Sequence, residues 1–189
     1  ESTLRAFEAR LERLGTDYVD LYLIHWPVAG KYQDTWRALE QIYREGRARS
    51  IGVSNFQIHH LEALRETSDI VPMVNQIEMH PHLQQAELLA YSNEHNIRLE
   101  AWRPIMMGEV NHIPELQAIA EQHGKTPVRV TLRWLLQLGV VTIPKSVTPA
   151  RIAQNIDLFD FELTDENMAT IATLDRHRRL GPDPDNFSF

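Results

Sequence analysis

The sequence predicts an α/β protein in which parallel strands alternate with helices, as in a (β/α)8 TIM barrel. Four apolar segments run into polar side chains, at residues 20–27, 51–56, 74–81 and 140–149. Segments with helical spacing separate them, and the predicted strands start roughly 25 to 40 residues apart, the length of a βαβ repeat. Because buried strands that end in polar groups place a site at one face of such a barrel, the pattern also predicts where the chemistry lies.

The first half of the chain contains three of the five predicted strands. Phe7 and Leu11 recur at helical spacing, and Gly15 ends that first helix. A strand at 18–24 follows, and Asp34 is expected to cap the second helix. The remaining expectations for this half are strands at 50–53 and 73–77 and helices at 58–64 and 85–93.

The second half continues the alternation, with two consecutive helices in place of one. Thr126 is expected to cap the second of them, with Pro127 at its first position and Gly139 just past its end. We expect strands at 97–101 and 140–143, helices at 114–123 and 126–138, and further helices starting at Thr148 and Thr164.

Length and composition limit the classes of protein and partner that the sequence can represent. The 189 residues are expected to form one domain, although a complete eight-unit barrel typically takes roughly 250 residues. The formal net charge of −7 does not suit binding to a phosphate backbone, so no nucleic-acid partner is expected. No apolar run approaches the ~20 residues that span a bilayer, so no membrane partner is expected. The absence of Cys, together with no recognisable signal peptide, predicts a cytoplasmic protein.

His25 is the first candidate for chemistry, because it directly follows a predicted strand. A His at the carboxyl end of a strand can donate a hydrogen bond to a substrate oxygen or transfer a proton. The alternative is a structural His whose polar atoms are satisfied by its neighbours. Trp26 beside it would line an apolar pocket or cover the end of the barrel.

Two further polar groups lie at predicted strand ends. Ser54, Asn55 and Gln76 offer both donors and acceptors, which suits a ligand carboxamide, although Ser54 or Asn55 could instead cap the next helix. Lys145 and Arg151 flank a helix start, where cations, hydroxyls and unpaired amides favour an anion such as phosphate. The alternative there is a solvated helix cap.

A metal site is not predicted. His80 and His82 alternate along an extended segment, but no third ligand lies near them in the sequence. His59 and His60 are interpreted as a surface pair at the start of a helix.

Several of these motifs, in this order, resemble the aldo-keto reductase family, and the resemblance covers nearly the whole chain as one domain, 1–189. The resemblance implies a (β/α)8 barrel that reduces aldehydes and ketones with NADPH, here with about five strands and without the N-terminal barrel units. The segments that carry it are Leu21–Pro27, 46–56, Val74–Pro81 and Ile143–Asn155. Glu100–Trp102 and the tail 180–189 look most like the bacterial branch of 2,5-diketo-gluconate and small-aldehyde reductases.

The resemblance also implies roles for single residues. His25 matches the active-site histidine, Trp26 a substrate-pocket aromatic, and Trp102 the aromatic that stacks on the nicotinamide. Ser54, Asn55 and Gln76 match the groups that hold the nicotinamide carboxamide. The positions that match the 2′-phosphate and adenine site are Lys145, Ser146, Val147, Thr148, Arg151 and Asn155.

The sequence departs from the family pattern in three places. Arg103 stands where a small residue, often Ser, is usual, and Gln154 where Glu often faces the adenine. The family's catalytic Tyr, with the Lys and Asp that support it, belongs to barrel units that precede the matched region. The chain itself is therefore expected to be weakly active or inactive. Alternatives are a non-catalytic nucleotide-binding subunit and a structural partial barrel, and open sheet edges would favour self-association.

Overall fold

The computed structural model of the protein describes residues 1–187 and confirms the α/β class. Five strands form one sheet in the order β1-β2-β3-β4-β5, which is their order in the chain. The pairs β1–β2, β2–β3 and β4–β5 are parallel. Because a closed barrel of this class has eight strands, the fold is a partial (β/α)8 barrel. Residues 188 and 189 of the tail lie outside the described residues.

The chain divides into two compact units, each of which is described by itself. Unit 1 comprises Glu1–Gln76, Leu88–Arg98 and the segment from Asp183 onward, and unit 2 comprises Ile77–Glu87 and Leu99–Pro182. The single domain expected for residues 1–189 stays a prediction.

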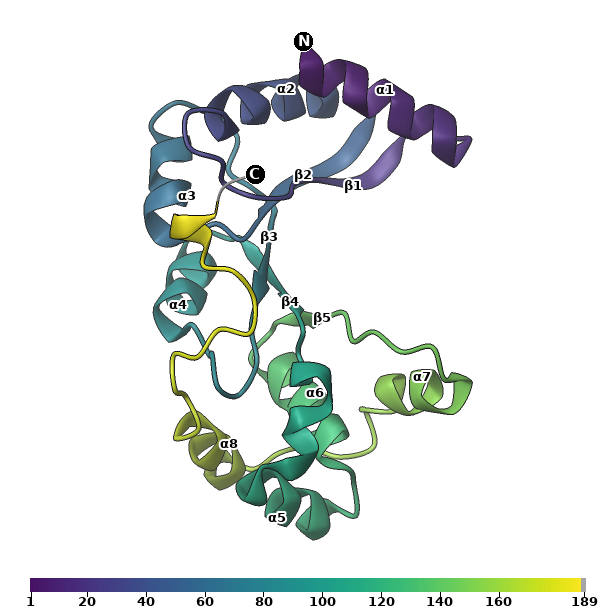
Figure 1. The fold of residues 1–189 in the computed structure, drawn as a ribbon, viewed down its shortest axis with the longest axis vertical. Coiled ribbons are helices and arrows are strands. Elements are labelled where there is room, and N and C mark those ends of the chain that lie inside the picture. Colours follow the sequence, from purple (N-terminus) through teal and green to yellow (C-terminus); the bar gives the residue numbers. More distant parts are fainter. Residues whose placement is uncertain (188–189) are drawn as a thin grey trace. The chain divides into compact units, whose positions relative to one another are not determined.

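Unit 1 contains the first two strands, the start of the third and the helices between them. In Figure 1, α1 packs on α2, and α2 covers β1 and β2. The elements are α1 (Ser2–Leu14), β1 (Val19–Ile24), α2 (Tyr32–Arg44), β2 (Ala48–Ser54), α3 (Ile58–Arg65), β3 (Val74–Glu78), α4 (Ala86–Glu94) and the 3-10 turn η2 (Pro184–Asn186).

Unit 2 contains the end of β3, most of β4 and the helices after it. Here α6 packs on α5 and β5, and α5 packs on α8. The elements are β4 (Arg98–Trp102), η1 (Met106–His112), α5 (Pro114–His123), α6 (Pro127–Gln137), β5 (Val141–Thr142), α7 (Pro149–Ile156) and α8 (Asp165–Ala172). The 3-10 segment η1 was not expected from the sequence.

The element boundaries follow local signals, with one clear error. Thr126 caps α6 as predicted, because its side chain accepts a hydrogen bond from the Arg129 amide. Asp34 does not cap α2: the helix begins at Tyr32, and Lys31 occupies the cap position. Asp34 lies instead in the first turn, where a carboxylate still interacts favourably with the helix dipole.

The strands of unit 1 pack closely around Gly52. A Cβ atom at this position would lie 2.4 Å from the Val74 carbonyl oxygen and 2.8 Å from Leu23 Cδ2. Both distances are far below van der Waals contact, and the nearer atom is backbone that cannot rotate away. The side chain of a larger residue would therefore separate β2 from β1 and β3.

The C-terminal segment of unit 1 is held on α3 by His59 and His60. Asp185 Oδ1 lies 3.2 Å from His59 Nε2 and 3.7 Å from His60 Nε2. The backbone N–H of Gln57 donates to His60 Nδ1 over 3.1 Å at the start of α3. Because Nδ1 is the acceptor, the proton of a neutral His60 lies on Nε2. His60 thus links the helix start to the C-terminal segment.

Among the helices formed by residues 1–187, none combines the length and the apolar character that crossing a lipid bilayer requires.

Replacing Gly52 by Ala tests the close approach of the strands. We expect Gly52→Ala to lower the free energy of unfolding by about 3 kcal/mol, because the methyl group overpacks a backbone contact. Chemical denaturation provides the measurement. Gly124→Ala is the control: Gly124 has a φ of 62° and open space around it, so only backbone strain applies, about 1 kcal/mol. Equal losses in the two variants would contradict the packing argument.

A second prediction concerns the pH dependence of stability. Burial, followed by the nearby His59, lowers the pKa of His60 to about 4, against 6.5 for an ordinary His. The unfolded chain therefore takes up a proton that the folded chain does not, and stability is lost as the pH falls from 6.5 towards 4. Between pH 7.5 and pH 5 we expect this residue to account for a loss of about 2 kcal/mol.

The variant His60→Gln isolates this contribution. A Gln side chain can still accept from the Gln57 amide but has no proton to take up, so the loss between the two pH values should shrink. Burial also lowers the pKa of His82, so some pH dependence should remain. The exposed His112 supplies the control variant His112→Gln, which should behave as the unaltered protein does. An unchanged pH dependence in His60→Gln would rule out this assignment.

Candidate functional site

The first part of the candidate site lies at the carboxyl ends of three parallel strands in unit 1. His25 directly follows β1, Ser54 is the last residue of β2, and Gln76 pairs with Ser54 from β3. Parallel strands present their carboxyl ends at one edge, so these residues lie at the same edge of the sheet. The structure therefore brings together the polar groups that the sequence placed at strand ends.

A hydrogen-bond network joins these three strand ends. The backbone carbonyl oxygen of Gln76 accepts hydrogen bonds from Ser54 Oγ and from the backbone N–H of Asn55, each over 2.8 Å. Asn55 Nδ2 donates to the His25 carbonyl oxygen at 3.0 Å and to Ser54 Oγ at 3.1 Å. Ser54 and Asn55 are only 2% and 4% exposed, so the network is shielded from water.

The backbone at Asn55 adopts an unusual conformation. Its φ is 65°, in the left-handed region, which Asn tolerates better than most residues. The next residue, Phe56, is held by Asn75, whose Nδ2 donates to the Phe56 carbonyl over 2.9 Å and whose Oδ1 accepts from the Phe56 amide. The buried Asn75 was not singled out in the sequence, although it stands directly before Gln76.

The exposed His25 has an aromatic neighbour, which is itself stacked on a second ring. The Trp26 ring lies 6.0 Å from the His25 ring, centroid to centroid. Phe187, from the C-terminal segment of unit 1, stacks on Trp26 at 4.0 Å with an interplanar angle of 16°. The stack gives His25 an apolar neighbour on the side of Trp26, and the role of Trp26 in lining a pocket stays a prediction.

The second part of the candidate site belongs to unit 2. Trp102 is the half-exposed last residue of β4, and Arg103 follows with a φ of 53°. The Arg103 guanidinium lies 5.4 Å from the Trp102 ring centroid, and its Nη1 donates to the Leu180 carbonyl over 2.7 Å. Arg103, which stands where the family usually has a small residue, therefore bonds to the backbone of its own chain.

The predicted phosphate site also lies in unit 2, between β5 and α7. Lys145 and Arg151 are exposed, and among residues 1–187 neither has an ion-pair partner. Ser146 Oγ accepts from the Thr148 amide over 3.2 Å, which shapes the turn into the helix. Val147 is exposed in this turn, and Asn155 and Gln154 lie one turn further along α7 than Arg151. Two unpaired cations beside a helix start form a favourable site for an anion.

One titratable group near Trp102 was missed in the sequence. Glu78 is buried in unit 2, and its carboxylate accepts hydrogen bonds from the Leu180 and Gly181 amides. Burial alone would raise the pKa of Glu78, but the bonds from His80, Leu180 and Gly181 outweigh it and lower the pKa below its ordinary value. A lone Glu directly after the predicted strand 73–77 gave no signal of this arrangement.

The group His59, His60 and Asp185 has the spacing of a metal site, with its ligand atoms within 4.8 Å of one another. A metal on His60 Nε2 would require the ring proton to move to Nδ1. Nδ1 faces the Gln57 amide, which is itself a donor, so the two hydrogens would clash. The chemistry of the group fits an electrostatic contact with Asp185 better than metal ligation.

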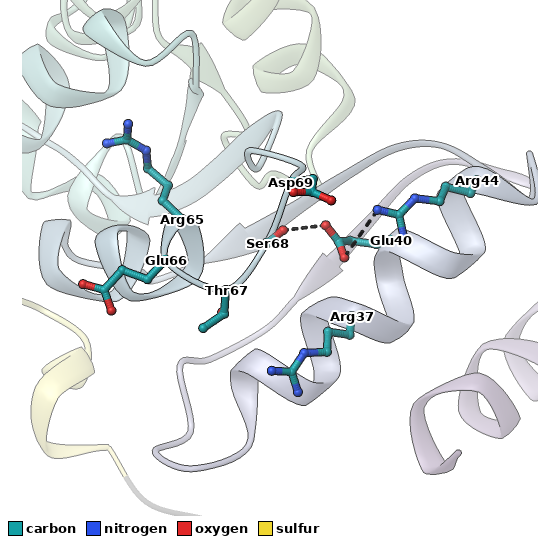
Figure 2. Close-up of a pocket in the computed structure, with 8 residues that line it drawn as sticks. All are labelled: Arg37, Glu40, Arg44, Arg65, Glu66, Thr67, Ser68 and Asp69. Atoms are coloured by element: carbon teal, nitrogen blue, oxygen red, sulfur yellow. Dashed lines mark hydrogen bonds and ion pairs between the residues drawn. The ribbon is translucent and has the colours of Figure 1, made fainter.

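A polar pocket in unit 1 lies away from the strand ends that carry the candidate site. Figure 2 shows its charged lining, contributed by α2, the end of α3 and the loop that leads into β3. Glu40 within it accepts from Ser68 Oγ and from the Ile70 amide, and Trp36 Nε1 donates to Ser68 Oγ over 2.8 Å. These bonds fix the loop before β3 to α2, so the pocket has a structural explanation.

Comparison with known proteins identifies the family to which the chain is similar. Residues 1–176 match the model of the Aldo/keto reductase family, a match that spans both units. The chain is 56% identical over 189 residues to glyoxal reductase of Bacillus subtilis, covering 100% of this chain and 68% of that protein. It is 45% identical over 181 residues to methylglyoxal reductase DkgA of Escherichia coli, covering 94% of this chain and 66% of that protein.

A solved structure of a mutant of Gox0644 in complex with NADPH superimposes with a TM-score of 0.96 and 46% sequence identity, covering 100% of this chain and 71% of that one. The chain thus spans about two thirds of the relatives that it matches. The family match, these identities and the shared fold lead to one conclusion: the chain belongs to the aldo/keto reductase family.

Proposed function

We propose that the protein takes part in the NADPH-dependent reduction of small aldehydes and ketones to alcohols. The observation that carries the proposal is the network at the ends of β1, β2 and β3, where Ser54, Asn55 and Gln76 meet beside His25. Two relatives are named for the reduction of glyoxal and methylglyoxal, which supports small dicarbonyl compounds as the substrate class.

Each unit, taken by itself, offers groups that suit a part of NADPH. In unit 1, Ser54, Asn55 and Gln76 combine hydroxyl and amide groups, the chemistry that a carboxamide requires. In unit 2, Trp102 offers an aromatic face. The groups proposed for the 2′-phosphate and adenine are Lys145, Ser146, Val147, Thr148, Arg151 and Asn155. When bound, NADPH supplies the hydride of the reaction.

His25 is proposed to orient the carbonyl oxygen of the substrate, and Trp26 to line the pocket around it. The backbone carbonyl of His25 accepts a hydrogen bond from Asn55. The start of the loop that carries the imidazole is therefore attached to the proposed carboxamide site. The proton donor of the family, a Tyr, belongs to barrel units that precede the matched region. We therefore propose that the polypeptide 1–189 by itself turns over carbonyls poorly.

Self-association is a further part of the proposal. The side chains of Val147, Ile156 and Phe159 in unit 2 are 85%, 72% and 78% exposed, and α7 buries none of its residues. Apolar side chains exposed to this degree on neighbouring segments are typical of surfaces that another protein segment covers. This feature also favours the second candidate function, a partial barrel with a structural or nucleotide-binding role.

The double variant Lys145→Ala/Arg151→Ala tests the cofactor preference. We expect NADPH affinity to fall about 100-fold and NADH affinity to change little, because only NADPH carries the 2′-phosphate that the two cations would bind. Calorimetric titration with each dinucleotide measures both affinities. Arg13→Ala, which removes an exposed cation from α1, is the control and should leave both affinities unchanged. Equal losses for NADPH and NADH would contradict recognition of the phosphate.

The activity of the chain is tested against a chimera that adds the first barrel units of glyoxal reductase in front of Glu1. With a small dicarbonyl substrate, we expect NADPH oxidation by residues 1–189 to be slower than by the chimera by about 10²–10⁴, the contribution of a general acid. Replacing the supplied Tyr by Phe should return the chimera towards the lower rate. If residues 1–189 matched the chimera, the proton donor would have to lie within this chain.

A further inference from the structure

The starting point is the buried carboxylate of Glu78 and the segment that it holds. Its Oε1 accepts from the Leu180 amide at 2.8 Å and from the Gly181 amide at 3.1 Å, and its Oε2 also accepts from the Gly181 amide at 3.1 Å. His80 Nε2 lies 3.3 Å from Oε1, and neither side chain is exposed to solvent. Two consecutive amides and an imidazole therefore surround one ionised group.

The same segment is fastened at a second point in unit 2. The carbonyl oxygen of His82 accepts from the amides of Arg176 and Arg178, at 3.2 Å and 3.0 Å. The residues 176–181 are thus attached at one end to the loop after β3, through His82, and at the other end to Glu78, the last residue of β3. Because hydrogen bonds to a buried charge are stronger than those between neutral groups, Glu78 is the firmer of the two attachments.

The segment held by Glu78 packs against the edge of the Trp102 ring. A Cβ atom at position 181 would lie 2.4 Å from Trp102 Cη2 and 3.3 Å from Glu78 Oε2, so only Gly fits between the ring and the carboxylate. Arg103 binds the same segment through the Leu180 carbonyl and extends its guanidinium over the Trp102 ring. Both backbone polar groups of Leu180 are therefore hydrogen-bonded, the N–H to Glu78 and the carbonyl to Arg103.

We propose that Glu78 is a positioning residue for Trp102. It fixes the Leu180–Gly181 backbone against the edge of the indole ring, and Arg103 secures the same backbone from its carbonyl side. The proposal rests on the proposed function, in which Trp102 stacks on the nicotinamide of NADPH. A stacked ring contributes to binding only if its plane is held, and groups that hold such side chains commonly change affinity although they do not touch the ligand.

The first test reads the position of the ring without any cofactor. The indole N–H signal of Trp102 in a ¹⁵N NMR spectrum of the full chain is assigned by its disappearance in Trp102→Phe. We expect this signal to shift or broaden in Glu78→Gln, where an NH₂ group must face one of the donors that the carboxylate accepted. Gly181→Ala should produce a similar change through direct contact with the ring.

Glu40→Gln provides a matched control. Glu40 is also buried, 6% exposed, and also accepts from a backbone amide, but its contacts lie in unit 1 with Ser68 and Ile70. Its replacement should lower stability, measured by chemical denaturation, while the Trp102 signal stays in place. An unmoved Trp102 signal in Glu78→Gln would overturn the proposal.

The second test connects the ring position to the cofactor through a double-mutant cycle. Glu78→Gln should weaken NADPH binding about tenfold in the full chain and cause little further loss in a Trp102→Ala background. Independent, additive losses would overturn a role through Trp102. If the unaltered protein did not bind NADPH, or if Trp102→Ala left binding unchanged, the proposed function would fail. The indole signal would then decide by itself whether Glu78 positions the ring.

Discussion

The carbonyl oxygen of Gln76 is the atom on which the geometry of the strand ends in unit 1 depends. It accepts two hydrogen bonds from consecutive residues, the Ser54 hydroxyl and the Asn55 amide. To reach both, the chain turns into the left-handed region at Asn55, and the Asn55 side chain then extends the connection to the His25 carbonyl. One acceptor thus coordinates three strand ends. Small polar residues at these positions have a structural role before any ligand is considered.

The fold class and the strand-end residues could be predicted from the sequence because each follows from local patterns. Alternating apolar segments and turn residues located the five strands. Ser54 ends β2, Asn55 follows it, and Gln76 pairs with Ser54 from β3. The cap at Asp34 was wrong because the chain enters α2 two residues earlier than the first strong capping signal. The 3-10 segment η1 has no comparable signature, since Met107 and Gly108 adopt positive φ values within it.

The contacts made by Glu78 could not be predicted, and the reason is distance along the chain. Its partners, Leu180 and Gly181, contribute backbone amides, and an amide carries no sequence signal. Arg103 shows the same difficulty, because its hydrogen-bond partner is also a backbone group, the Leu180 carbonyl. Sequence motifs identify side chains that recognise ligands more readily than those that hold other segments in place.

Both units use a buried glutamate for the same physical purpose. In unit 1, Glu40 binds the loop before β3 through Ser68 and the Ile70 amide, and in unit 2, Glu78 binds residues 180 and 181. Burying a carboxylate is costly unless several donors satisfy it, so each irregular segment is held in the one arrangement that supplies those donors. The loop held by Glu40 leads into the N-terminal end of β3, and Glu40 binds this loop through Ser68 and Ile70. The segment held by Glu78 contacts the Trp102 ring directly. The two glutamates therefore differ in what the segment that they hold contacts. Because the segment held by Glu78 contacts Trp102, Glu78 is connected to the proposed cofactor site, whereas Glu40 has a structural role only.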